Sequence, residues 1–175
     1  MNYKLLKSDI IYRGKVFDVQ VDKIKYESGN ESIREIAVHN GGAVVVAVTP
    51  ENKIILVEQF RYPFETRLLE LPAGKLDPGE DPKICAGREL TEETGYTAGK
   101  ISKLGSICTT PGFCTEVLHI YLAEDLTPGN HNREEGEQGM EMMELTVDEI
   151  ESMISSGKIT DAKTICGIHY YKNSK

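Results

Sequence analysis

The chain has 175 residues, of which 39% are hydrophobic and 27% charged, and its formal net charge is -8 at pH 7. This length predicts one globular domain that buries roughly two-thirds of the surface of its unfolded form. The chain lacks clusters of Lys and Arg, which argues against nucleic-acid binding, and no apolar run nears the ~20 residues of a membrane span. The first residues lack the apolar core of a secretory signal, so we expect a soluble, cytoplasmic protein without membrane partners.

The cysteines and histidines give no sign of a metal centre or a nucleophile. Cys85, Cys108, Cys114 and Cys166 form no CxxC pair and have no His at zinc-like spacing. We therefore expect reduced and mostly buried thiols. The four histidines are scattered outside any recognisable motif with Ser or Cys, so we assign them no catalytic role.

The first part of the chain alternates apolar and polar residues as β-strands do. Residues 16–26 and 33–39 have this period of two and flank a turn at 28–32, which predicts an antiparallel hairpin. Residues 43–49 and 53–60 are β-branched runs separated by a tight turn. We expect these two runs to be adjacent central strands and the best buried of the chain.

A helix is predicted over residues 82–94. Asp81 is suited to cap its first turn, Pro82 takes the favoured first helical position, and Gly95 can supply the left-handed residue that ends it. The other predicted elements are strands at 68–71, 100–108, 116–124 and 139–146, and helices at 146–155 and 162–171. This order predicts a mixed sheet with helices on its faces, in the α+β class.

Acidic residues gather on one face of the predicted helix. Glu89, Glu92 and Glu93 are spaced i, i+3 and i+4, and Arg88 precedes Glu92 by four residues, so the two can pair along the helix. Neighbouring carboxylates repel, and a divalent cation such as Mg²⁺ removes that cost. The alternative is a solvated acidic face, which is the usual role of such a run.

The spacing around the acids favours the cation. Gly74, five residues, Glu80, seven residues and then "RELTEETGY" match the pattern GX5EX7REUXEEXGU, in which U is aliphatic and only Tyr96 departs. The chain therefore resembles the Nudix family, of which this pattern, the Nudix box, is the signature. The resemblance implies a mixed α-β-α sandwich, with Mg²⁺ or Mn²⁺ as cofactor and the following roles. The metal ligands are Glu89, Glu93, Glu92 (also a water-mediated, catalytic partner) and the Ala73 carbonyl, and Arg88 holds the acids in place.

Other segments resemble the ADP-ribose pyrophosphatase group of this family, over roughly residues 12–170. They include "REIAVH", "EQFRYP", "LLELPAGKLDPGE", "TTPGF" and "DAKT". Arg34 and Arg61 then correspond to arginines that contact the substrate, for which a planar guanidinium suits a phosphate. The full set of implied substrate-binding residues is Arg34, Arg61, Glu58, Pro111, Gly112, Phe113 and Glu116.

The resemblance also divides the chain. Residues 1–40 are expected to form a hairpin used in homodimerisation and substrate contact, and residues 41–175 the Nudix hydrolase domain. Tyr12 and Phe17 are candidates to stack the adenine, although core or interface packing is the more usual role of an aromatic. In the loop before the last strand, Glu135 and Glu137 are the candidates for the base that accepts a proton from water, with Glu137 slightly favoured.

The resulting hypothesis is Mg²⁺-dependent hydrolysis of ADP-ribose to AMP and ribose 5-phosphate. One alternative is the same chemistry on another nucleotide sugar such as GDP-mannose, because the box determines the bond cleaved and not the substrate. A second alternative is a nucleotide-sensing module without turnover. The retained box acids argue against that alternative.

Overall fold

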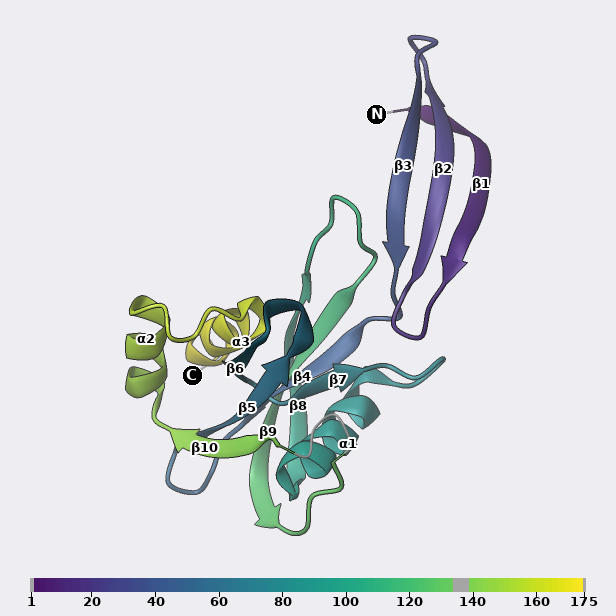
Figure 1. Ribbon diagram of the computed structural model, residues 1–175. Coiled ribbons are helices and arrows are strands. Elements are labelled where there is room, and N and C mark those ends of the chain that lie inside the picture. The colour runs from purple at the N-terminus through teal and green to yellow at the C-terminus, as the bar shows by residue number, and fades with distance from the viewer. Residues whose placement is uncertain (1, 134–138, 175) are drawn as a thin grey trace. The chain divides into compact units, whose positions relative to one another are not determined.

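The computed structural model describes residues 2–133 and 139–174 (Figure 1). Contacts within the chain divide it into two compact units. The first unit comprises residues 1–41 and 108–117, and the second comprises residues 42–107 and 118–175. Each unit is described by itself.

The first unit is built on a three-stranded antiparallel sheet in the order β1-β2-β3 (Figure 1). Its strands are β1 (Tyr3–Arg13), β2 (Asp18–Tyr26) and β3 (Glu31–Val38). The predicted hairpin is confirmed as β2 and β3. Sequence analysis missed β1, because its adjacent apolar pairs break the period of two. Register shifts at Leu5/Lys7 and Ile10/Tyr12 coincide with those pairs.

The second unit contains two sheets. The four-stranded sheet has the order β7-β4-β9-β8, and β4 runs parallel to β9 and antiparallel to β7. The three-stranded sheet has the order β10-β5-β6. The strands are β4 (Gly42–Ala47), β5 (Ile54–Arg61), β6 (Thr66–Glu70), β7 (Ala73–Lys75), β8 (Tyr96–Cys108), β9 (Val117–Pro128) and β10 (Glu141–Leu145).

The α-helices of the second unit begin where capping residues predict, and a short 3-10 helix without a side-chain cap precedes them. These elements are the 3-10 helix η1 (Tyr62–Phe64), α1 (Pro82–Thr94), α2 (Val147–Ser155) and α3 (Ala162–Lys172). Thr146 and Glu149 form the predicted capping box of α2, and Asp161 caps α3 by accepting from the Thr164 N–H. No helix within residues 2–133 and 139–174 is long and apolar enough to cross a membrane.

One prediction about the central strands is wrong. The turn between β4 and β5 is tight, with the Thr49 N–H donating to the Lys53 carbonyl at 2.8 Å. The two strands nevertheless lie in different sheets. Both edges of β4 are paired, with β7 and β9, and both edges of β5 are paired, with β10 and β6, so neither has an edge for the other. Their expected burial is confirmed.

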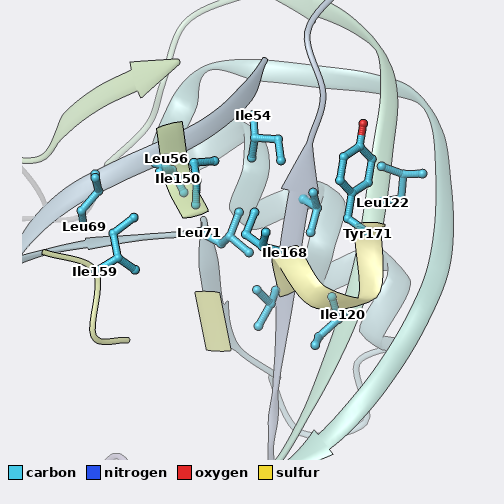
Figure 2. Close-up of a cluster of buried hydrophobic side chains, with 12 residues drawn as sticks. Ile54, Leu56, Leu69, Leu71, Ile120, Leu122, Ile150, Ile159, Ile168 and Tyr171 are labelled. Carbon is cyan, nitrogen blue, oxygen red and sulfur yellow. The ribbon is translucent and has the colours of Figure 1, made fainter. Parts of the chain in front are cut away.

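Alternate residues of β4 face two hydrophobic clusters. Val44 and Val46 join the larger cluster, to which α3 contributes Ile168 and Tyr171 (Figure 2). Ala43, Val45 and Ala47 join the second cluster, to which α1 contributes Cys85, Ala86 and Leu90. Because successive side chains of a strand point to opposite faces, α1 and α3 cover opposite faces of β4. This layering agrees with the expected α-β-α sandwich.

All four cysteines are free. Only Cys85 is buried; Cys108 is exposed, and Cys114 and Cys166 are intermediate. The prediction that most of them are buried is wrong.

Candidate active site

The helix that carries the acidic cluster, α1, has the predicted bounds and caps. The Asp81 side chain accepts a hydrogen bond from the Lys83 N–H at 2.7 Å, and Pro82 occupies the first helical position. At the other end, Gly95 has a φ of 81° and donates its N–H to the Thr91 carbonyl at 2.8 Å. Local signals therefore suffice to place the acids on a helix.

The first glycine of the box is required by space. A β-carbon at Gly74 would lie 1.9 Å from Oε1 and 2.3 Å from Oε2 of Glu89. Gly74 lies in β7 opposite Ala43 of β4, so this backbone is held in a sheet and cannot easily retreat. The missing side chain lets the Glu89 carboxylate lie against the strand.

Arg88 binds three carboxylates. Its Nε and Nη2 donate to the two oxygens of Glu80, each at 3.0 Å. Its Nη1 donates to Glu89 at 2.7 Å and to Glu92 at 2.9 Å, and Nη2 also donates to the Lys75 carbonyl at 3.2 Å. The expected pairing of Arg88 with Glu92 is confirmed. A bidentate guanidinium orients these acids as well as neutralising part of their charge.

This pairing shifts the pKa values of the neighbouring groups. The hydrogen bonds from Arg88 lower the pKa of Glu80 to about 2, and those to Glu80 raise the pKa of Arg88. Burial, with the charges of Glu89 and Glu80, raises the pKa of Cys85 to about 12. The Cys85 thiol therefore stays neutral at physiological pH and is unsuited to act as a nucleophile or a thiolate ligand.

Glu89 and Glu93 are the most buried acids of the box. Glu89 is 7% exposed and Glu93 is 2% exposed. The Ala73 N–H donates to Oε2 of Glu93 at 3.1 Å, so the start of β7 contacts this acid through its amide. Burial of an ionised carboxylate is costly unless donors or cations compensate its charge. Glu93 is therefore sensitive to the loss of these partners.

The donor set suits a hard divalent cation. Carboxylate oxygens are the ligands preferred by Mg²⁺ and Mn²⁺, and α1 supplies Glu89, Glu92 and Glu93. Among residues 2–133 and 139–174, no three His, Cys, Asp or Glu side chains are arranged to hold an ion. Arg88 pairs with Glu89 and Glu92, so a cation would require these side chains to turn away from it.

A second charged cluster surrounds Glu70. Arg61 donates from Nε and Nη2 to the Glu70 carboxylate at 2.7 and 2.6 Å, and Lys163 pairs with the same carboxylate and with Asp161. The hydrogen bond to Glu70 raises the pKa of Arg61 against the effect of burial, and the charge of Glu93 adds to the rise. Arg61 is thus within electrostatic reach of a box acid, but one edge of its guanidinium already binds Glu70.

Glu58 is held by an arginine of the neighbouring strand. It lies in β5, and Nε of Arg67 in β6 donates to its Oε2 at 2.8 Å. Nη2 of Arg67 also donates to the Gly139 carbonyl at 2.6 Å, just before β10. The contact shown for the Glu58 carboxylate is therefore an ion pair between adjacent strands of the three-stranded sheet.

The first unit has a cavity of about 330 Å³. Four of the predicted substrate-binding residues line it, namely Arg34, Pro111, Gly112 and Phe113. Its other lining residues are Tyr3, Asp22, Ile24, Tyr26, Glu35, Ile36, Cys114 and Thr115. The segment 111–115 is held beside β3 by backbone bonds, such as the Ala37 N–H to the Phe113 carbonyl at 2.7 Å.

Arg34 is oriented by contacts within the first unit. Nη1 donates to the Ile33 carbonyl at 2.8 Å, Nη2 donates to the Tyr26 hydroxyl, and Cζ lies 5.9 Å from the Tyr26 ring centroid. Tyr12 and Phe17, the predicted stacking candidates, are exposed and do not line the cavity.

Comparison with known proteins establishes the family. A model of the NUDIX domain matches residues 39–165. The chain belongs to the Nudix family. It is 44% identical over 168 residues to an ADP-ribose pyrophosphatase of Bacillus subtilis, an alignment that covers 95% of this chain and 91% of that one. It is 42% identical, with the same coverage, to a methanol dehydrogenase activator of Bacillus methanolicus.

A more distant relative and a solved structure complete the comparison. A GDP-mannose pyrophosphatase of Escherichia coli is 32% identical over 77% of this chain and 74% of its own. The crystal structure of an ADP compounds hydrolase superposes with a TM-score of 0.88 over 99% of this chain and 94% of the other, at 19% identity. This likeness confirms the predicted Nudix fold.

Glu116 belongs to the first unit, where it lies 3.4 Å from Nδ1 of His39. The candidate bases Glu135 and Glu137 lie outside the described residues.

Two sets of side-chain contacts in the second unit were not expected from the sequence. Ser106 Oγ lies 3.0 Å from Nδ1 of His119 on neighbouring strands, and burial lowers the pKa of His119, which favours a neutral imidazole. Arg133 donates to the carbonyls of Glu93 and Met140. No local signal could reveal either, because the partners lie 13 and 40 residues away in the sequence.

Proposed function

We propose that this Nudix protein hydrolyses the diphosphate of ADP-ribose to AMP and ribose 5-phosphate, and that it depends on Mg²⁺ or Mn²⁺. The observation that carries the proposal is the cluster of box acids around α1, in which Arg88 donates to Glu80, Glu89 and Glu92. The 44% identity to an ADP-ribose pyrophosphatase extends over 95% of the chain, so more than the box supports the assignment.

The box residues would hold the cation. Glu89, Glu92 and Glu93, with the Ala73 carbonyl, are the proposed ligands, and their hard oxygens fit either ion. When bound, the metal would neutralise charge on the diphosphate and make a water molecule easier to deprotonate. Arg88 keeps the carboxylates close together in the metal-free protein, and Glu89 and Glu92 would turn from it towards a bound cation.

The reaction needs a proton acceptor. Water attacks one phosphorus, the bridging phosphorus–oxygen bond breaks, and the proton of the water passes to a carboxylate. We assign this role to Glu137 or Glu135, which precede β10 in the sequence. Glu92 is a candidate catalytic partner because its side chain is half-buried and hydrogen-bonded to Arg88.

Separate features of the two units support substrate binding. In the first unit, Arg34, Pro111, Gly112 and Phe113 line a cavity that offers a guanidinium and aromatic rings, a combination suited to a nucleotide. In the second unit, Arg61 is a partly exposed cation near Glu93. We also retain Glu58 and Glu116 as contacts.

The protein is proposed to be a cytoplasmic homodimer. Every residue of β1 is exposed, including Tyr3 at 62% and Ile11 at 65%. A long apolar edge strand is a liability for a monomer, and a second copy of the chain would cover it. Four free cysteines suit a reducing compartment. Sedimentation analysis of the purified protein tests the dimer.

Turnover assays test the function. With Mg²⁺, wild-type protein should release AMP and ribose 5-phosphate from ADP-ribose faster than it cleaves GDP-mannose or a nucleoside triphosphate. Glu93→Gln should lower kcat/KM at least about a hundredfold, because a lost ligand weakens charge stabilisation worth several kcal/mol. Glu151→Gln, on the exposed surface of α2, is the matched control.

Three results would overturn the proposal. Faster cleavage of GDP-mannose would support the second candidate, which the Escherichia coli relative favours. A preference for a triphosphate would exclude both substrates. Equal, near-zero turnover by wild type and Glu93→Gln, with ADP-ribose still bound, would identify a non-catalytic module.

A further inference from the structure

The C-terminal end of α1 needs hydrogen-bond donors from elsewhere. The last four carbonyls of an α-helix have no partner inside it. Gly95 supplies one donor, its N–H to the Thr91 carbonyl at 2.8 Å, which is the single bond of a left-handed cap. The next two carbonyls belong to Glu92 and Glu93, the proposed metal ligands in the last turn.

A distant segment provides these donors. The Asn132 N–H donates to the Glu92 carbonyl at 3.0 Å. Nε of Arg133 donates to the Glu93 carbonyl at 2.7 Å. A guanidinium is a favourable group at this position because the C-terminal end of a helix carries partial negative charge. Residues 132 and 133 therefore cap the turn that carries two box acids.

Glycines allow this close approach. A β-carbon at Gly95 would lie 2.9 Å from both the Gly129 carbonyl oxygen and the His131 nitrogen. A β-carbon at Gly129 would lie 3.0 Å from the Gly95 carbonyl oxygen. Gly95 thus serves both the left-handed backbone and the contact with the distant segment, which is an independent sign that the two segments pack against each other.

Arg133 also connects α1 with the start of β10. Its Nη1 donates to the carbonyl of Met140, which is 4% exposed and precedes β10. A second link runs in parallel, because the Tyr96 hydroxyl donates to Glu144 of β10 at 3.3 Å. Tyr96 is the residue where this chain departs from the aliphatic position of the box. A tyrosine at this position therefore gives the end of α1 a hydrogen bond to β10.

We propose that Arg133 is a positioning residue for the metal site. It prevents fraying of the last turn of α1 and so holds the backbone that presents Glu92 and Glu93. The inference rests on the proposed function, because it assigns these two carboxylates to the cation. The contacts of Arg133 are to backbone carbonyls, so its proposed effect on the cation is indirect.

The test measures metal binding separately from turnover. Isothermal titration of the metal-free protein with Mg²⁺ should show about tenfold weaker binding for Arg133→Ala, the lower end of the effect expected when a residue supporting a ligand is lost. The Mg²⁺ affinity of Arg133→Lys should lie between those of wild type and Arg133→Ala. A single ammonium group cannot donate to both carbonyls as the guanidinium does. The Asn132 amide should exchange its hydrogen faster in Arg133→Ala, and kcat should fall while KM changes little.

Lys172→Ala is the matched control. Lys172 lies in the last turn of α3 and pairs with Glu151, so this variant removes a helix-terminal cation that does not contact α1. Its Mg²⁺ affinity should equal that of wild type. Should Arg133→Ala fail to fold, the intermediate affinity of Arg133→Lys decides the question.

Distinct results separate this inference from the proposed function. A lower melting temperature for Arg133→Ala with unchanged Mg²⁺ affinity and kcat would show a purely structural residue and overturn the inference. Absence of Mg²⁺ binding by wild type would overturn it as well. Absence of ADP-ribose turnover with normal Mg²⁺ binding would refute the proposed function alone, and the titrations would still test Arg133.

Discussion

The second unit contains two clusters of ionisable side chains that differ in charge balance. In the box cluster, one guanidinium faces several carboxylates. In the Glu70 cluster, the charges are matched, with two carboxylates and two cations. The box cluster comprises Arg88, Glu80, Glu89 and Glu92, and the Glu70 cluster comprises Glu70, Asp161, Arg61 and Lys163.

This difference in charge balance indicates which of the two clusters can bind a cation. A buried pair with balanced charges satisfies its own hydrogen bonds and gains nothing from another ion. The box cluster keeps an excess of negative charge after Arg88 has bound, and a divalent cation is the species that would complete it. Glu70 is 2% exposed and forms ion pairs with Arg61 and Lys163. It therefore stabilises the fold and orients Arg61.

The largest effect is predicted for a substitution that disrupts the Glu70 cluster. Glu70→Ala leaves Arg61 and Lys163 without their shared partner, and removing one member of a buried pair costs about 3–5 kcal/mol. That is a large share of the 5–15 kcal/mol by which domains are usually stable. Urea denaturation of the metal-free protein, with a chelator present, measures the change in the free energy of unfolding.

The same substitution in the box cluster is the control. Glu92→Ala removes one of several like charges from a half-exposed position, so the metal-free stability should change by less than about 1 kcal/mol. Equal losses for Glu70→Ala and Glu92→Ala would contradict the distinction between the clusters.

The sequence predicted the box cluster because its determinants are local. The spacing of Glu89, Glu92 and Glu93 determines one helical face, and Asp81 and Gly95 determine the bounds of that helix. The same reasoning predicted the hairpin of β2 and β3. It also placed the caps of α2 and α3 correctly.

The sequence could not predict the Glu70 cluster or the Arg133 cap. Lys163 lies 93 residues after Glu70, and Arg133 lies 40 residues after Glu93, so only the tertiary fold brings them together. Strand pairing is equally non-local. The buried runs of β4 and β5 looked like neighbours, yet β9 arrives from elsewhere in the chain to pair with β4.

A smaller effect is predicted for the glycine that faces Glu89. In Gly74→Ala, the new methyl group would meet the Glu89 carboxylate at 1.9 Å, so that side chain must move. Overpacking of this kind costs about 1–3 kcal/mol. Mg²⁺ binding should weaken as well, because Glu89 is a proposed ligand. Calorimetric titration and urea denaturation measure the two effects.

A second glycine tests whether the effect is local. Among the atoms of residues 2–133 and 139–174, a β-carbon at Gly139 would meet only Nη1 of Arg67, at 3.7 Å, which is ordinary contact. Gly139→Ala should therefore keep the Mg²⁺ affinity of wild type. Wild-type affinity in Gly74→Ala would show that the position of Glu89 does not matter for the cation.

The smallest predicted effect is a pH dependence of the free energy of unfolding. It tests how Arg88 stabilises the box in the absence of metal. Arg88 lowers the pKa of Glu80 from 4.5 to about 2, so the carboxylate of the folded state resists protonation. The stabilisation is complete above about pH 4.5 and is lost as the pH falls towards 2. The whole shift corresponds to about 3 kcal/mol, and solvent screening at this edge of the cluster reduces it to about 1 kcal/mol. Glu80→Gln should be less stable than wild type by that amount at pH 7, and the difference should vanish near pH 2. Urea denaturation across this range in a chelator measures it, and a difference independent of pH would exclude Glu80 ionisation as its source.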